Sequence, residues 1–263
     1  MLDGLLERPP DAVALSFLLR YFATTDRDEV REMLGQALTA ALEKCADEPS
    51  VAGRADWLSL FRDAAALSDD ERLPAAAGSL VASLRRDWRS KISVADAADA
   101  IEAGLHATDL DPDGAGALIT AAVDELERIV GHSYGPGEGI GDYADHVRAA
   151  AALMTAYEVT GRLPYAMLAE ELMQASKRTP VPDRGFGTAC EAARVFCRLA
   201  GLHNDPDYRA AAILAPNADY RADASRLLDV LAPRARAGGA AIYGLALLEL
   251  LAITIESPDT YGY

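Results

Sequence analysis

The chain has 263 residues, of which 51% are hydrophobic and only 6% aromatic, so Ala and Leu supply much of its apolar content. Its formal net charge of −16 opposes binding to nucleic-acid phosphates and to anionic lipid. We therefore expect no nucleic-acid partner and no membrane partner. Alanine favours helices and lets them approach closely, so the composition indicates an all-α protein.

Helical periodicity and helix-start signals predict about twelve helices. The first six follow Asp11, follow Asp26, contain WLSLFRDAAAL, follow SDDERLP, begin at a capping box of Ser93 and Asp96, and run from about 115 to 130, where Gly131 can end the helix. The other six contain DYADHVRAAAALMTAYEVTG, LPYAMLAEELMQASK, GTACEAARVFCRLAG, the short NDPDYR, NADYRADASRLLDVLA and GGAAIYGLALLELLAI.

Short connections between these helices predict antiparallel neighbours, so the expected unit is a helical hairpin. Six hairpins can close into a ring or stack into an open solenoid. Both terminal hairpins are apolar, whereas a solenoid end needs a polar cap, and this favours closure. We expect residues 1–263 to form a single domain, an all-α (α/α)6 toroid of about twelve antiparallel helices.

Four stretches resemble the helical toroid of the spermatogenesis-associated, YyaL-type thioredoxin-domain proteins. PPDAVALSFLLRYFATTDRDEVREML resembles its opening hairpin, and DYADHVRAAAALMTAYEVTGRLPYAMLAEELM resembles a central one. ACEAARVFCRLAGLHNDPDYR and LAPRARAGGAAIYGLALLELL resemble its last part. The resemblance implies a toroid related to six-hairpin glycosidases and sugar epimerases, with a pocket at one mouth of the ring. The sequence shows neither the thioredoxin domain, nor a CxxC motif, nor the family's His-Phe-Glu-Lys stretch, so no catalytic acidic pair carries over.

The stretch GHSYGPGEGIGDYADH, residues 131–146, has four alternating glycines. A phosphate-binding loop needs a preceding strand and a Gly-Lys-Ser/Thr end, but here a helix precedes and acidic residues follow. Two interpretations stay open. The stretch is either a flexible link in which Asp142 caps the next helix, or the rim of a pocket for a polyol.

The candidate site residues come from this stretch and from a second irregular loop, KRTPVPDRGFG, which we expect on the same side of the ring. The candidate acid–base residues are His132, Glu138, Asp142 and His146. The candidate ligand-binding residues are Tyr134, Tyr143, Arg184 and Phe186.

Two other patterns are similar to metal sites without completing them. DLDPDGAGALIT starts like an EF-hand loop but lacks the Glu at its twelfth position, so we expect an acidic helix start. Cys190, Cys197 and His203 lack the Cys-His-Gly of zinc-binding lanthionine-cyclase toroids, so we expect two buried thiols. Glu170 and Glu171 are adjacent in one helix and are expected on a solvated face. We expect no metal and no cofactor.

The termini and the cysteines predict a cytoplasmic protein. MLDGLLERPP lacks the basic start and apolar core of a signal peptide. The apolar run 240–255 contains Glu249 and is shorter than the ~20 residues that span a bilayer. The third cysteine is Cys45, and three cysteines form an odd, sparse set that fits a reducing compartment.

Three functions stay open, and the sequence does not decide whether the chain is an enzyme. The first is a diverged, catalytically degenerate toroid that binds a small polar ligand or a protein partner at its mouth. The second is a carbohydrate-active enzyme, a sugar epimerase or a glycoside-hydrolase-like protein, which uses the acid–base residues above. The third is a structural or oligomerising helical protein whose apolar stripes bury a partner or a second copy.

Overall fold

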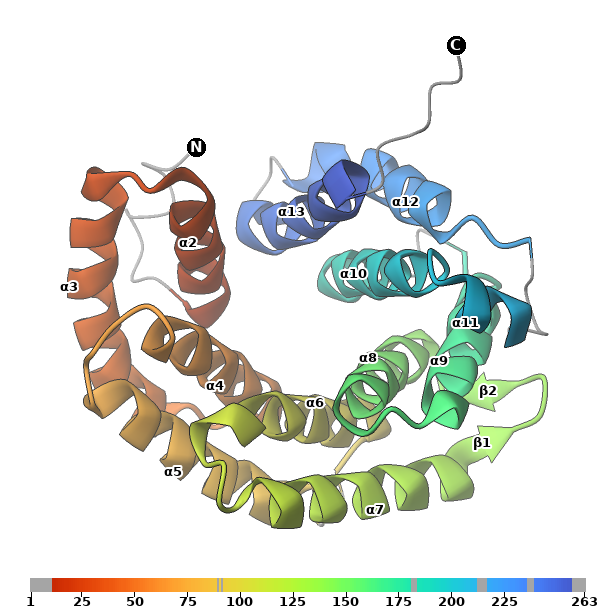
Figure 1. The fold of residues 1–263 in the computed structure, drawn as a ribbon, viewed down its shortest axis with the longest axis horizontal. Coiled ribbons are helices and arrows are strands. Elements are labelled where there is room, and N and C mark those ends of the chain that lie inside the picture. The colour runs from red at the N-terminus through yellow and green to blue at the C-terminus, as the bar shows by residue number, and fades with distance from the viewer. Residues whose placement is uncertain are drawn as a thin grey trace.

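The chain folds into helices arranged in an inner and an outer layer (Figure 1). The computed structural model describes residues 11–88, 90, 92–180, 184–211, 217–235 and 239–256. These residues hold twelve α-helices and one small β-hairpin, so the all-α prediction is confirmed. Among these helices, none has both the length and the apolar composition needed to cross a membrane.

All twelve expected helices are present. They are α2 (Ala12–Thr25), α3 (Asp28–Lys44), α4 (Val51–Ala65), α5 (Arg72–Asp87), α6 (Val94–His106), α7 (Ala115–Ser133), α8 (Tyr143–Thr160), α9 (Leu163–Ser176), α10 (Phe186–Leu202), α11 (Pro206–Ala211), α12 (Tyr220–Arg234) and α13 (Ala240–Glu256). Between α7 and α8, β1 (Tyr134–Gly135) pairs antiparallel with β2 (Gly139–Ile140).

The inner layer consists of α2, α4, α6, α8, α10 and α13 (Figure 1). Each of these helices packs against the next, and α13 packs against α2. The outer partners are α3, α5, α7, α9 and α12, each packed on the inner helix that precedes it. The short α11 spans only six residues, and the helix that packs on α10 from outside is α12.

Side-chain caps start several of the expected helices. Asp11 accepts a hydrogen bond from the backbone N–H of Ala14 at 2.7 Å, and Ser93 accepts one from the N–H of Asp96. Asp142 and Asp145 form a complete capping box at the start of α8, which confirms the predicted cap. Such caps satisfy backbone donors that the first helical turn leaves without partners.

Asp145 also links two helices of the inner layer. Its Oδ2 accepts a hydrogen bond from the backbone N–H of Asp142 at 3.2 Å, and its Oδ1 accepts one from the N–H of Ala95 at 3.0 Å. Ala95 lies in the first turn of α6, so the N-termini of α6 and α8 lie side by side at one end of the layer.

Two predicted helix boundaries were wrong. Asp26 does not cap α3: it has a left-handed backbone with φ 48°, and its N–H donates to the carbonyl of Phe22, so it ends α2. Asn and Asp tolerate this conformation better than other non-glycine residues. Gly131 does not end α7 either, because the helix continues to Ser133.

Alanine-rich faces allow the closest packing within the inner layer. Four consecutive alanines of α8, Ala149 to Ala152, are each at most 1% exposed, and α6 contributes Ala98, Ala100 and Ala103 to the same core. Small side chains leave no bulk between the two helix backbones. The helices α6 and α8 therefore pack on each other along much of their length.

The alternating glycines form the turn of the β-hairpin and its exit. Gly137, Gly139 and Gly141 have φ values of 77°, 83° and 52°, a region that favours glycine. A Cβ at Gly139 would lie 2.1 Å from Nε2 of His146. The sequence did not predict these two strands, but the link between helices that it did predict is the segment that forms them.

Glu170 of α9 is buried, and the expected solvated face was wrong for this residue. Its side chain is 1% exposed, its Oε1 accepts a hydrogen bond from the hydroxyl of Tyr220 at 2.7 Å, and the same oxygen lies 2.8 Å from Nε2 of His203. Burial raises the pKa of Tyr220, and its hydrogen bond to Glu170 adds to that shift. The neighbouring Glu171 accepts a hydrogen bond from the hydroxyl of Tyr134 at 2.6 Å.

Alanine substitutions at Gly137 and Gly139 distinguish the cost of backbone strain from the cost of a steric clash. Both have positive φ, but a Cβ at Gly137 would meet nothing within 4 Å. We expect Gly137→Ala to lower the free energy of unfolding by about 1 kcal/mol, and Gly139→Ala to lower it by about 3 kcal/mol because Ala also collides with His146. Urea denaturation measures both values.

The same experiment in a His146→Ala background tests the cause. Removing the imidazole removes the clash, so the cost of Gly139→Ala should then fall to that of Gly137→Ala. Equal costs for the two alanine variants with His146 intact would contradict the packing described here.

Candidate functional site

A polar cavity of about 390 Å³ lies between the six inner helices. Each of these helices contributes to its wall, mostly with side chains three or four positions apart, which share one face of a helix. The charged groups of the wall are five arginines, six carboxylates and one histidine: Arg20, Arg62, Arg148, Arg194, Arg198, Asp56, Asp63, Asp99, Glu102, Glu191, Glu249 and His106.

The first ion cluster joins α10, α13 and α2. Arg194 donates from Nε to Oε1 of Glu249 and from a terminal nitrogen to Oε2 of Glu191, both at 2.8 Å. Arg20 donates to the same oxygen of Glu249 at 3.0 Å. Burial alone would raise the pKa of Glu249, but Arg194 and Arg20 together hold it below its ordinary value. Glu249 therefore stays ionised between the last and the first inner helix.

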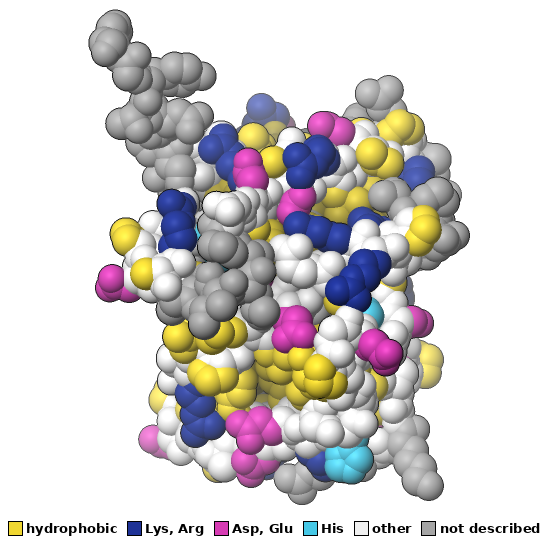
Figure 2. Space-filling model, turned by 90° about the vertical axis from the view of Figure 1, so that its right-hand side faces the viewer, with side chains coloured by type: hydrophobic (Ala, Val, Ile, Leu, Met, Phe, Trp, Pro, Cys, Tyr) yellow, Lys and Arg dark blue, Asp and Glu magenta, His cyan; other side chains and the backbone are white. Residues whose placement is uncertain are grey.

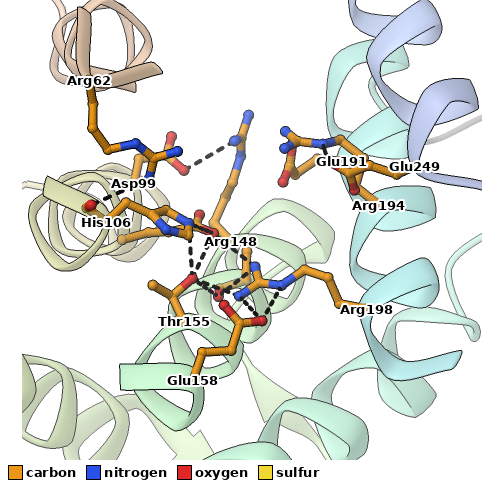
Figure 3. A network of polar contacts seen from close by, with 12 residues as sticks. Arg62, Asp99, His106, Arg148, Thr155, Glu158, Glu191, Arg194, Arg198 and Glu249 are labelled. Atoms are coloured by element: carbon orange, nitrogen blue, oxygen red, sulfur yellow. Dashed lines mark hydrogen bonds and ion pairs between the residues drawn. The ribbon is translucent and has the colours of Figure 1, made fainter. Parts of the chain in front are cut away.

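The second cluster joins α10 to α6 and α8 (Figure 3). Arg198 donates to Oε1 of Glu102 at 3.0 Å and to the hydroxyl of Thr155 at 2.7 Å. Nε2 of His106 lies 3.6 Å from the same Glu102 oxygen. Burial opposes the charge of Glu102, but His106 and Arg198 lower its pKa. The exposed Glu158 accepts a further hydrogen bond from Nε of Arg198.

Arg148 projects from α8 into the middle of the charged groups (Figure 3). One terminal nitrogen lies 3.2 Å from Oδ1 of Asp99, and this ion pair is its one polar contact with a described residue. Burial raises the pKa of Asp99 to about 8, and Arg148 only partly opposes this shift.

Three further polar side chains of the cavity have no partner among the described residues. Asp56 and Ser59 of α4 and Ser16 of α2 line the cavity and make neither a hydrogen bond nor an ion pair there. Asp56 is exposed to the space of the cavity, but the protein around it reduces its hydration and raises its pKa to about 6, although Arg148 opposes the shift. These groups face space that another molecule can fill.

The eight residues proposed from the sequence do not line this cavity. The structure does bring their two loops together, since Arg178 donates to the carbonyl of Gly137 and the guanidinium of Arg184 lies 5.1 Å from the ring centre of Tyr143. Phe186 packs under Arg234 at 5.2 Å. The proposed ligand-binding roles of Tyr134, Tyr143, Arg184 and Phe186 stay predictions.

The four proposed acid–base residues have mostly local contacts. Nε2 of His146 lies 3.2 Å from the backbone nitrogen of Ile140 and 3.2 Å from the carbonyl oxygen of Glu138. Asp142 caps α8, and Nδ1 of the exposed His132 lies 2.9 Å from the carbonyl oxygen of Arg128. Their catalytic roles are untested and also stay predictions.

The cavity residues were missed although the sequence carries a signal for them. Glu191, Arg194 and Arg198 recur at helical spacing within an otherwise apolar helix, and Asp99 and Glu102 do the same in α6. Such a stripe is the usual mark of a solvated face. The contact of α13 with α2 is what makes these stripes face a common cavity.

The cysteines and the acidic loop behave as structural elements. Cys190 and Cys197 are buried free thiols, as expected, and burial raises the pKa of each to about 12. Oδ1 of Asp111 accepts a hydrogen bond from the N–H of Gly114, the residue that precedes α7. Within the described part of the chain, no three His, Cys, Asp or Glu side chains converge to hold a metal ion.

The Glu249 cluster gives a stability prediction. We expect Glu249→Ala to lower the free energy of unfolding by about 3 kcal/mol, because it leaves the guanidinium of Arg194 buried with one partner fewer. Glu158→Ala is the control: it removes a more exposed partner of Arg198 and should cost less than about 1 kcal/mol. Equal costs in urea denaturation would contradict a special role for the Glu249 cluster.

Asp56 gives a prediction about pH. Its pKa in the folded chain, about 6, exceeds its ordinary value of 3.8, so the folded state holds the proton more tightly. The stability from this group is therefore greatest at acid pH and is lost as pH rises through 6. The free energy of unfolding of Asp56→Asn, relative to wild type, should increase between pH 4 and 6 and then level off.

A urea-denaturation series at several pH values checks this. Asp109→Asn is a matched control, because Asp109 lies outside the cavity, in the short 3-10 helix before α7. The same pH-dependent difference in both variants would contradict the raised pKa of Asp56 in the folded chain.

Compared with protein-family models, with curated proteins and with solved structures, the chain gives no significant match. The resemblance to the YyaL-type toroids therefore depends on the quoted stretches alone, and the function has to be argued from the cavity.

Proposed function

We propose that the chain is an (α/α)6 toroid of the YyaL-type kind that binds a small polar ligand in its central cavity. The toroid proposal is supported by the sequence of contacts through the inner layer, which runs from α2 to α13 and back to α2. The five outer helices, each packed on an inner one, support the hairpin repeat.

The observation that supports ligand binding is the set of unpaired polar groups in the cavity. Asp56 is exposed in the cavity, Ser59 and Ser16 are half-buried, and none of the three has a hydrogen-bond partner among the described residues, so all three are open to a ligand. The volume of about 390 Å³ is within the ~300–1,000 Å³ of small-molecule sites. Because the lining is charged, we expect the ligand to be polar.

Acid–base catalysis on the bound ligand is a second candidate, and the two aspartates favour it. With pKa values of about 6 and about 8, Asp56 loses its proton at a lower pH than Asp99. Such a pair can accept a proton at one group and donate one at the other. The lining residues include no Phe, Tyr or Trp side chain for stacking on a sugar ring. The structure therefore supports acid–base catalysis better than it supports a carbohydrate as the substrate.

A purely structural or oligomerising role has less support. The large apolar side chains that are exposed among the described residues are Leu67, Val230, Leu247 and Leu251, and only the last two lie one turn apart on a single helix. The outer face at the right of Figure 1 mixes basic, acidic and apolar side chains (Figure 2). A stable interface normally has a contiguous apolar centre.

A ligand screen by thermal unfolding tests the proposal. The panel holds polyols, sugars, small amines, small carboxylates and amino acids. At a hundredfold excess over Kd a bound ligand adds about 2.7 kcal/mol to the free energy of unfolding, which should raise Tm by about 5 °C or more.

Ser59→Phe fills part of the cavity and should abolish this rise in Tm. The matched control, Ser79→Phe, places the same ring on the exposed side of α5 and should leave the rise intact. No shift in wild type with any compound, or an equal shift in wild type and Ser59→Phe, would overturn the proposal.

A further inference from the structure

We infer that the ligand of the central cavity is a small zwitterion, which places its cationic group at Asp56 and its anionic group at Arg148. This inference rests on the proposed function, because it assigns the chemistry of the ligand in the same cavity.

Asp56 is the one carboxylate of the lining without a charged partner among the described residues. The pairs of the others are Asp63 with Arg62, Asp99 with Arg148, Glu102 with Arg198 and His106, Glu191 with Arg194, and Glu249 with Arg194 and Arg20. A carboxylate that accepts hydrogen bonds at up to four positions is therefore open to a ligand's donor.

Arg148 is the corresponding cation. The other four arginines of the lining each donate at least one hydrogen bond to a carboxylate: Arg20 to Glu249, Arg62 to Asp63, Arg194 to Glu191 and Glu249, and Arg198 to Glu102. Arg148 has only its ion pair with Asp99 and no hydrogen bond to a described residue. The remaining donors of its planar guanidinium match a carboxylate or another planar anion.

These two groups belong to the same part of the cavity. Arg148 is the cation with the strongest electrostatic effect on Asp56, yet no ion pair joins them. The side chain of Arg148 extends from α8 toward the space between α6 and α10 (Figure 3). A molecule with one positive and one negative end can pair with the Asp56 carboxylate and with the Arg148 guanidinium at the same time.

The charge of the lining excludes simpler ligands. Six carboxylates oppose a purely anionic ligand, and five guanidinium groups oppose a purely cationic one. A neutral polyol would leave Asp56 without a counter-charge and would offer the remaining donors of Arg148 only neutral acceptors, and the lining offers a sugar ring no Phe, Tyr or Trp side chain. A zwitterion adds no net charge to the cavity and pairs both free groups.

The serines of the lining provide hydrogen bonds beside Asp56. Ser59 follows it by one helical turn on α4, and Ser16 faces the same cavity from α2. A hydroxyl can accept a hydrogen bond from an ammonium group and donate one to a carboxylate. The small Ala52 and Ala55 leave room next to these groups.

Calorimetric titration with a matched three-carbon series tests the inference. The probes are L-alanine, β-alanine, propylamine, propionate and glycerol, and γ-aminobutyrate extends the distance between the charges. We expect at least one of the zwitterions to bind, and propylamine, propionate and glycerol to bind at least about tenfold more weakly, since each lacks one or both charge-assisted contacts.

Two variants locate the contacts. Asp56→Asn keeps the shape of the side chain and should weaken binding of the zwitterion about tenfold or more, with little further effect on propionate. Arg148→Lys keeps the charge but loses the planar fork, and should weaken binding of the zwitterion but not of propylamine. Asp109→Asn, outside the cavity, should change nothing.

The outcomes separate the two proposals. If glycerol or a sugar binds in a Ser59-dependent way and no zwitterion does, the proposed function stands and this inference is wrong. If a zwitterion binds equally well to wild type and Asp56→Asn, this inference is also wrong. If none of the compounds in either panel binds, both proposals fall.

Discussion

The ion cluster around Glu249 is the contact on which the central cavity depends. Glu249 comes from the last inner helix, Arg194 from its neighbour, and Arg20 from the first, and all three meet at one carboxylate oxygen. Without the α13–α2 contact, the inner layer would be an open row of helices whose charged side chains faced solvent. One carboxylate thus joins segments that are more than two hundred positions apart in the chain.

Stability alone does not explain a lining of this kind. Removing charges from water costs several kcal/mol per ion, and well-packed apolar side chains in their place are often neutral or stabilising. The inner helices already carry apolar faces on their outward sides, with Ala, Leu and Cys buried between the layers. The polar centre costs free energy, Asp56 has no charged partner and Arg148 has only its ion pair with Asp99. The binding of another molecule explains these features better.

The sequence predicts the helices well because helix formation depends on the local spacing of apolar residues and on capping residues. Asp11, Ser93 and Asp142 each act within three residues, so one stretch of chain contains the whole interaction. The site is harder because its partners are far apart: Glu102 meets Arg198, and Glu170 meets His203, only after folding. The glycine stretch 131–146 has an unusual composition for a structural reason. Three of its glycines have positive φ angles, and at Gly139 the imidazole of His146 also leaves no room for a Cβ.

Asp145 lies at the end of the inner layer, away from the cavity, and bonds to the starts of two helices that carry cavity residues. Parallel neighbouring helices bring two positive dipole ends together, and a carboxylate placed between them offsets that repulsion. The same side chain joins the starts of α6 and α8, and Asp99 and Arg148, which pair in the cavity wall, lie on these two helices. A shift of one helix along the other would separate Asp99 from Arg148, so a contact at the ends of the two helices, outside the cavity, helps to align the charged wall.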